Sequence, residues 1–254
     1  MDPPGGCLRW AIMPNAVPRD RVSLRLLVAV GSGHERDDEL GLAHFVEHMA
    51  FNGSTNVPEG EMVKLLERLG LAFGADTNAS TGFERTTYML DLPRNDSALL
   101  DTALMLMRET ASELTISPAA VERERGVILS EKRDRNTFAL RNFEDQMQFL
   151  HPQARYATRL PIGTEESLNA ATAERLRAFW RREYVPAQTT LLVIGDFPIA
   201  VMEAAITARF ADWRPAPAEP QPPAGPLLRR TGPGEDVFID QALSERVTIT
   251  QEAP

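Results

Sequence analysis

The chain has 254 residues, of which 43% are hydrophobic, enough for one large domain or two small ones. Its 27 basic and 36 acidic residues give a net charge of −9, which argues against nucleic acid as a partner. No apolar run approaches the roughly 18 residues of a membrane span. A single cysteine, Cys7, excludes an internal disulfide framework and a zinc site built from cysteines. A globular protein of mixed helix and strand remains.

Hydrophobic periodicity and turn signals predict the elements in chain order. Strands are predicted over residues 22–31, 86–92, 188–195 and 247–250, and a small, Gly-interrupted segment over 71–80 is predicted to be extended. Helices are predicted over 38–51, 58–70, from Asn95 or Asp96 onward, from Ser117 with breaks to about 150, and over 173–183 and 199–210.

The stretch over residues 213–234 is rich in proline and is predicted to be a linker. We therefore expect a first domain over residues 1–212, the linker over 213–234, and the opening of a second, truncated domain over 235–254. The first residues contain no basic start followed by an apolar stretch, so no targeting segment is visible.

The segment His44-Phe-Val-Glu-His48 is the strongest chemical signal in the chain. On a helix, His44 and His48 are one turn apart on the same face, so their imidazole nitrogens can meet one metal ion. Glu47 lies on the same side, where it can reach a metal-activated water and take its proton. The alternative, a solvated polar helix face, is disfavoured by the apolar neighbours Phe45 and Val46.

A zinc site needs a third protein ligand, and the helix predicted to begin at Ser117 offers Glu124 and Glu131. These carboxylates are two helical turns apart, about 10 Å along the axis, so they cannot both bind one ion. One can bind the metal, and the other can hold a ligand histidine or the substrate region. Spacing alone leaves the choice open. His34 and His151 lie beside loop signals and are not expected to be ligands.

His-x-x-Glu-His is the inverted zinc-peptidase motif. With the segments GLAHFVEHMAFNGS, FGADTNASTGFERTTYMLDLP, ERERGVILSEKRD, RLPIGTEESL and LLVIGDF, the chain resembles the insulinase/pitrilysin family over nearly its whole length. The resemblance implies an α+β domain like that of mitochondrial processing peptidase, with helices packed on a mainly antiparallel sheet.

The resemblance also implies the site residues. It implies that His44, His48 and Glu131 bind zinc, that Glu47 is the catalytic base, and that Glu124 supports the ligands from behind. It implies that an extended peptide substrate lies along an edge strand, here around Asn78, Ala79 and Ser80. The alternative is that this segment is an ordinary edge strand that binds no substrate.

The leading prediction is a zinc endopeptidase domain acting on peptides or unfolded segments. Its C-terminal half would be supplied in cis or by a partner chain, because family members contain two or four related domains. The alternatives are a non-catalytic scaffold or partner subunit, and another zinc hydrolase. The resemblance makes the bacterial periplasm or cytoplasm the expected compartment without choosing between them.

Overall fold

A five-stranded sheet organises the first 195 residues. Its strand order is β1-β5-β2-β4-β3, with β1 parallel to β5 and every other neighbouring pair antiparallel. The computed structural model describes residues 6–72, 74, 76–214, 220, 234–238, 240 and 247–251. The strands are β1 (Arg9–Pro14), β2 (Val22–Val28), β3 (Thr77–Thr81), β4 (Thr86–Leu92) and β5 (Thr189–Gly195).

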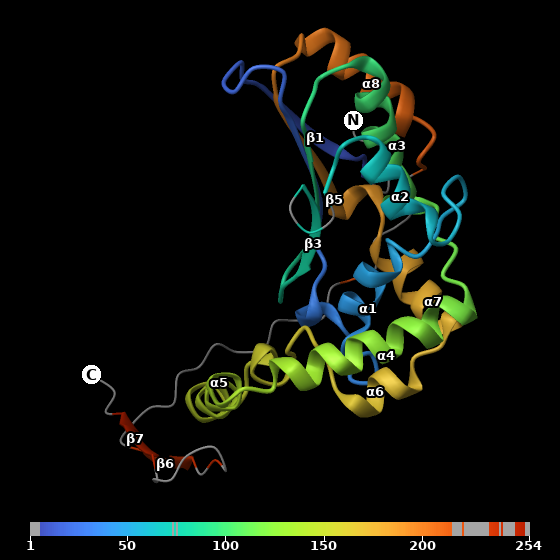
Figure 1. Ribbon diagram of the computed structural model, residues 1–254. Coiled ribbons are helices and arrows are strands. Elements are labelled where there is room, and N and C mark those ends of the chain that lie inside the picture. Colours follow the sequence, from blue (N-terminus) through green and yellow to red (C-terminus); the bar gives the residue numbers. More distant parts are fainter. Residues whose placement is uncertain are drawn as a thin grey trace.

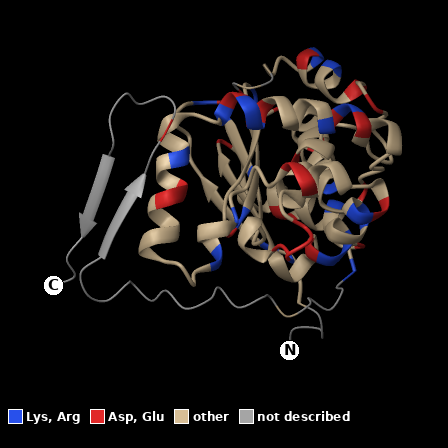
Figure 2. Ribbon diagram, turned by 90° about the horizontal axis from the view of Figure 1, so that it is seen from below, with Lys and Arg blue, Asp and Glu red and all other residues tan. Residues whose placement is uncertain are grey.

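Helices pack along one side of this sheet, and α4 and α5 continue beyond its lower end (Figure 1). The helices are α1 (Leu42–Met49), α2 (Glu61–Arg68), α3 (Ser97–Ser112), α4 (Pro118–Arg135), α5 (Phe138–Leu150), α6 (Glu165–Ala170), α7 (Ala173–Glu183) and α8 (Ile199–Phe210). Short 3-10 turns are η1 (Ser32–His34), η2 (Arg155–Thr158) and η3 (Pro186–Gln188). Basic and acidic residues are interspersed over the helices (Figure 2).

The core lies between the sheet and the helices. In β2, β4 and β5 every second side chain is fully buried, while the intervening ones are only half-buried. This alternation is what a sheet produces when one of its faces packs against helices. Leu24 and Leu26 of β2, Phe45 of α1 and Phe179 of α7 are among the fully buried side chains. The predicted α+β class is confirmed.

Several predicted helix boundaries are wrong, and glycine conformation explains two of them. The helix predicted from Asp38 begins at Leu42, because Gly41 precedes it with a φ of +93°, outside the helical region. The helix predicted from Pro58 begins at Glu61 after Gly60, whose φ is +79°. The helix predicted from Ser117 with breaks to about 150 is confirmed: α4 ends at Arg135, and Thr137 caps α5, its hydroxyl accepting the Leu140 N–H, before α5 ends at Leu150.

Beyond the sheet, β6 (Gly234–Phe238) pairs antiparallel with β7 (Val247–Gln251), which confirms the predicted strand over 247–250. Asp240 forms a bidentate ion pair with Arg141 of α5. Most of the proline-rich stretch over 213–234 lies outside the described residues. The division at 212 and 234 therefore stays a prediction. Among the described helices, none has the length and apolar character needed to cross a bilayer.

Candidate metal centre

Helix α1 carries the His-x-x-Glu-His segment inside the molecule. Phe45, Val46 and Met49 fill the core beside it, so the helix is held along its whole length. His44 and Glu47 are buried, and His48 is half-buried. The two imidazole rings lie one turn apart, with centroids separated by 4.7 Å at an interplanar angle of 80°. The local geometry therefore matches the spacing argument made from the sequence.

Helix α4 brings Glu131 to these histidines. Its Oε2 lies 3.6 Å from Nε2 of His44 and 3.4 Å from Nε2 of His48. One ligand atom from each of the three side chains lies within 4.8 Å of the other two. Among the described residues, this is the one group of three potential ligands that meets this spacing. The other Glu131 oxygen forms an ion pair with Arg135, one turn further along α4.

Glu124 lies behind His48 rather than beside the other ligand atoms. Its Oε2 is 3.1 Å from Nδ1 of His48, on the opposite side of the ring from Nε2. An acceptor at Nδ1 fixes the tautomer that leaves the Nε2 lone pair free. The same contact lowers the pKa of Glu124. Burial alone lowers the pKa of His48, but the hydrogen bond to Glu124 and the charges of Glu47 and Glu131 outweigh it and raise the pKa.

His44 has the opposite electrostatic environment. Burial, with smaller contributions from the charges of His48 and Arg135, lowers its pKa to about 3. The neutral imidazole is the form that binds a metal. Its Nδ1 is buried with no hydrogen-bond partner among the described residues, while Nε2 faces Glu131.

Glu47 is next to the ligands and is held by a strand. The Thr81 hydroxyl, at the end of β3, donates a hydrogen bond of 2.5 Å to Oε2 of Glu47. Burial raises the pKa of Glu47, although the Thr81 hydrogen bond and the charge of His48 act in the opposite direction. A carboxylate with a raised pKa and one remaining oxygen is suited to take up and return a proton.

A residue that the sequence reasoning missed holds the start of α1. Glu35 is completely buried, and its two oxygens accept the backbone N–H groups of Gly41 and Ala43, each at 2.9 Å. Burial raises the pKa of Glu35 to about 8, against the opposing effects of these two donors and of Arg159. Because His44 directly follows Ala43, Glu35 fixes the helical turn that presents His44. An acidic residue six positions before a helix cap gives no periodic signal.

An open groove runs between α1, α4 and β3, with a volume of about 830 Å³. It is lined by the three potential ligands, Glu47 and Glu124, and by residues 78–81 of β3. β3 is the last strand of the sheet, so one of its backbone edges has no neighbouring strand within the described part of the chain. Asn78 and Ser80 are exposed and Ala79 is half-buried on this edge. The predicted segment therefore lies beside the predicted metal ligands.

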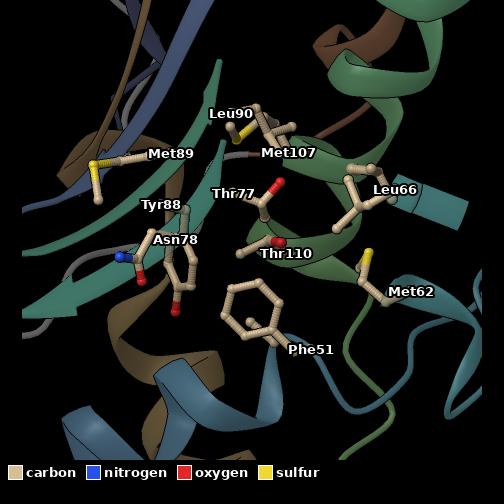
Figure 3. Close-up of a pocket in the computed structure, with 12 residues that line it drawn as sticks. Phe51, Met62, Leu66, Thr77, Asn78, Tyr88, Met89, Leu90, Met107 and Thr110 are labelled. Carbon is tan, nitrogen blue, oxygen red and sulfur yellow. The ribbon is translucent and has the colours of Figure 1, made fainter. Parts of the chain in front are cut away.

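A much smaller cavity of about 30 Å³ lies behind Phe51, between α2, α3 and the β3–β4 pair (Figure 3). The hydroxyl oxygen of Thr77 is buried there with no partner among the described residues. The volume is that of about one water molecule, too small for a substrate side chain. We therefore assign this cavity to the packing of α2 against the sheet and not to the chemistry of the groove.

The donor set fits a zinc ion. Two imidazole nitrogens and one carboxylate oxygen converge at a wall of an open groove, which matches a catalytic site with three protein ligands and a free position. The acceptor behind His48 and the neutral His44 both favour metal binding. The fold and the site together define a domain of the inverted zinc-peptidase class.

Comparison with known proteins identifies the family. The model described as Insulinase (Peptidase family M16) matches residues 11–159, and one described as Peptidase M16 inactive domain matches residues 170–254. The chain belongs to the insulinase family, peptidase family M16, as its sequence resemblance implied. The four residues of the centre, His44, Glu47, His48 and Glu131, all lie in the first matched segment.

Several relatives are zinc proteases by name. The probable zinc protease PqqL of Haemophilus influenzae is 38% identical over 189 residues, covering 74% of this chain and 20% of PqqL. The zinc protease PQQL-like protein of Arabidopsis thaliana is 32% identical over 249 residues, covering 97% of this chain and 26% of that protein. The chain thus spans about a fifth to a quarter of these relatives.

Solved structures agree on the fold. The first half of the periplasmic protease PqqL from Escherichia coli superposes with a TM-score of 0.84 at 33% identity, covering 89% of this chain and 48% of that one. A mutant of the ferredoxin protease FusC, crystallised in complex with Arabidopsis ferredoxin, gives a TM-score of 0.80 at 33% identity, covering 85% of this chain and 24% of that one.

Proposed function

We propose that this chain is the metal-binding catalytic domain of a zinc endopeptidase, with His44, His48 and Glu131 as the zinc ligands. The observation that carries the proposal is the convergence of their ligand atoms within 4.8 Å, with Glu47 beside them in the same groove. Bound zinc would supply a Lewis acid that makes water a nucleophile at neutral pH. The names of the relatives support this choice of metal.

Glu47 is the proposed proton carrier. Its Oε2 is occupied by the Thr81 hydroxyl, so Oε1 is the oxygen that takes a proton from the attacking water. The pKa of Glu47 is raised towards neutral pH, which suits a group that first accepts a proton and then returns it to the leaving amine. Thr81 orients the carboxylate, and Glu124 holds the ring of His48.

The substrate is proposed to be an extended peptide. The free edge of β3 offers backbone groups for one more strand, and Asn78, Ala79 and Ser80 line the groove beside the metal ligands. Extended or unfolded segments fit this edge, because a peptide must expose its own backbone to pair with it. The C-terminal half of a longer protein, in cis or as a partner chain, is proposed to close the groove.

Two variants test the proposal, with a third as a matched control. His48→Ala should lower the zinc content of the purified protein strongly, because it removes one of three ligands. Glu47→Gln should retain zinc and lose peptide cleavage. Glu122→Gln is the control, because Glu122 is an exposed glutamate of α4 that pairs with Arg125 and does not line the groove. Zinc is measured by mass spectrometry of the metal, and cleavage by a quenched fluorescent peptide.

Each outcome has a separate meaning. Unchanged zinc stoichiometry in His48→Ala would refute the ligand assignment. Zinc binding without cleavage, even with the C-terminal half supplied, would favour the alternative of a non-catalytic partner subunit. Cleavage that persists in Glu47→Gln would refute the role of Glu47 and leave the metal site intact.

A further inference from the structure

A second large cavity begins where β3 ends. It has a volume of about 880 Å³ and lies between the β3–β4 turn, α5 and η2. Its apolar wall is formed by Phe83, Phe143, Met147 and Tyr156. We call this cavity the aromatic pocket. It shares no lining residue with the groove of the metal centre, and the proposed chemistry does not use it.

The turn that carries Phe83 is fixed in place. The Ser32 N–H donates to the Gly82 carbonyl at 3.0 Å, and the Gly33 N–H donates to the Phe83 carbonyl at 2.8 Å. A Cβ added to Gly31 would lie 2.2 Å from the Gly82 oxygen, so the two segments approach as closely as glycine permits. The turn that carries Phe83 is therefore in place before any ligand binds.

Two of the polar side chains that line the pocket, Arg155 and His34, hold these loops. Arg155 donates to the Gly33 carbonyl at 3.0 Å and also bonds the Glu35 carbonyl. His34 accepts the Gly31 N–H at Nδ1 over 3.0 Å. Two exposed charged residues, Glu84 and Arg85, also line the cavity at its rim. Its apolar lining consists of aromatic and methionine side chains, which favour a large apolar group.

The aromatic side chains of the pocket leave apolar surface exposed to a ligand. The rings of Phe83 and Tyr156 meet edge to face, with centroids 6.1 Å apart at 71°. Phe143 projects from α5 with 40% of its surface exposed, one of the few large apolar side chains of the described residues that is not covered. A side chain that enters between these elements would cover Phe143 and remove its apolar surface from water.

The pocket continues the path of the proposed substrate. Thr81 ends β3 and contacts Glu47, and Phe83 follows two residues later. An added strand rises about 3.3 Å per residue, so a peptide leaving the metal centre past Thr81 reaches the pocket after two or three residues. Antiparallel strand pairs are slightly more stable than parallel ones, so we take the peptide to run opposite to β3. Because the pocket lies beyond the C-terminal end of β3, the residues N-terminal to the scissile bond then lie over it.

We propose that the aromatic pocket is a specificity subsite that binds a large apolar side chain two or three residues N-terminal to the scissile bond. This inference rests on the proposed function, because it takes the peptide to lie along β3. Its occupant is an extended peptide carrying a phenylalanine, leucine or methionine at that position.

Peptide binding to the zinc-loaded Glu47→Gln protein tests this subsite without requiring turnover. Otherwise identical labelled peptides, each with a single phenylalanine moved one position at a time, are titrated by fluorescence anisotropy. Cleavage products of the wild-type chain supplied with its C-terminal half, identified by mass spectrometry, give the position of the scissile bond. Phe143→Ala is the test substitution, and Ile199→Ala is the control because Ile199 is similarly exposed on α8 and lines neither cavity.

We expect one peptide register to bind best, and Phe143→Ala to weaken that peptide about tenfold while changing the others less than twofold. Ile199→Ala should change none of them. Equal effects of both substitutions, no effect of Phe143→Ala, or a preference on the C-terminal side of the scissile bond would overturn the subsite. If the wild-type chain supplied with its C-terminal half does not cleave but Phe143→Ala still weakens one register selectively, the proposed function is refuted and the pocket is supported only as a binding site for an apolar side chain of a peptide.

Discussion

Replacing Glu35 should disturb the candidate metal centre although Glu35 is not one of its proposed ligands. Both oxygens of this buried side chain accept N–H groups at the start of α1, from Gly41 and Ala43 at 2.9 Å each. Glu35→Ala leaves two buried donors without partners, at about 1–3 kcal/mol each. The free energy of unfolding should therefore fall by about 2–6 kcal/mol, which is a large share of the stability of a typical domain.

Zinc affinity should fall as well, because His44 follows Ala43 in the first turn of α1. If that turn opens in the metal-free protein, the measured dissociation constant rises by the inverse of the closed fraction. A loss of about 1.4–2.8 kcal/mol in the stability of this turn makes the zinc dissociation constant about 10–100-fold larger. Glu35→Gln keeps one acceptor oxygen, so its zinc dissociation constant should rise by about tenfold, the lower end of this range. Competition with a chromophoric chelator measures these constants.

Glu109→Gln is the matched control for this prediction. Glu109 is also buried, and it accepts the backbone N–H of Asn56 at 2.9 Å and its side-chain amide at 2.6 Å. It does not line the groove. The control should lose stability and keep its zinc dissociation constant within about twofold. Equal losses of zinc affinity in both variants, or unchanged affinity in Glu35→Ala, would refute the role of Glu35 in presenting His44.

Four further predictions follow from described contacts. Glu131→Gln should weaken zinc binding most, and Glu124→Gln about 10–100-fold, as measured by chelator competition; the reverse order would exchange the two roles. Burial alone raises the pKa of Asp91, but hydrogen bonds with Arg25 lower it on balance, so Asp91→Asn should cost about 0.5–1 kcal/mol at pH 7 in urea unfolding. This difference should disappear as the pH falls below 3.8, because the stability that a lowered pKa contributes is lost on protonation. Thr77→Val should stabilise the fold by about 1 kcal/mol in the same assay, because it removes a buried hydroxyl without a partner; a loss would show that the hydroxyl is satisfied. The 254-residue chain alone should cleave peptides far more slowly than with its C-terminal half, and equal rates would contradict this.

The sequence was sufficient for the parts of the site that depend on helical spacing. His44 and His48 are one turn apart because α1 is a regular helix, and Glu124 and Glu131 occupy one face of α4 for the same reason. Spacing could not assign their roles, because that depends on where α4 crosses α1. The structure brings Glu131 to Nε2 of both histidines and Glu124 to Nδ1 of His48, and the metal-binding role of Glu131 stays a proposal.

Elements defined by contacts distant in sequence were missed. β1 has no fully buried side chain, so it lacks the alternation that marked β2, β4 and β5. It is a strand because it pairs with β5, about 180 residues later. The start of α1 was predicted too early, because Asp38 and Glu39 resemble a first helical turn, whereas Gly41 and the distant acceptor Glu35 decide where the helix begins.

The position of β5 sets a rule for how this domain can be made. β5 lies between β1 and β2, so two strands synthesised early have no partner at that position until residue 195 has been added. On the ribosome, the edges of β1 and β2 that later pair with β5 would therefore stay open for most of synthesis. During that time these edges could pair with strands of other chains, which is a route to aggregation. A version of the domain cut at residue 159, where the first family match ends, would keep the proposed metal ligands and lose β5, the strand that joins β1 to β2. Boundaries for expression are therefore better placed after α8 than at the end of the first family match.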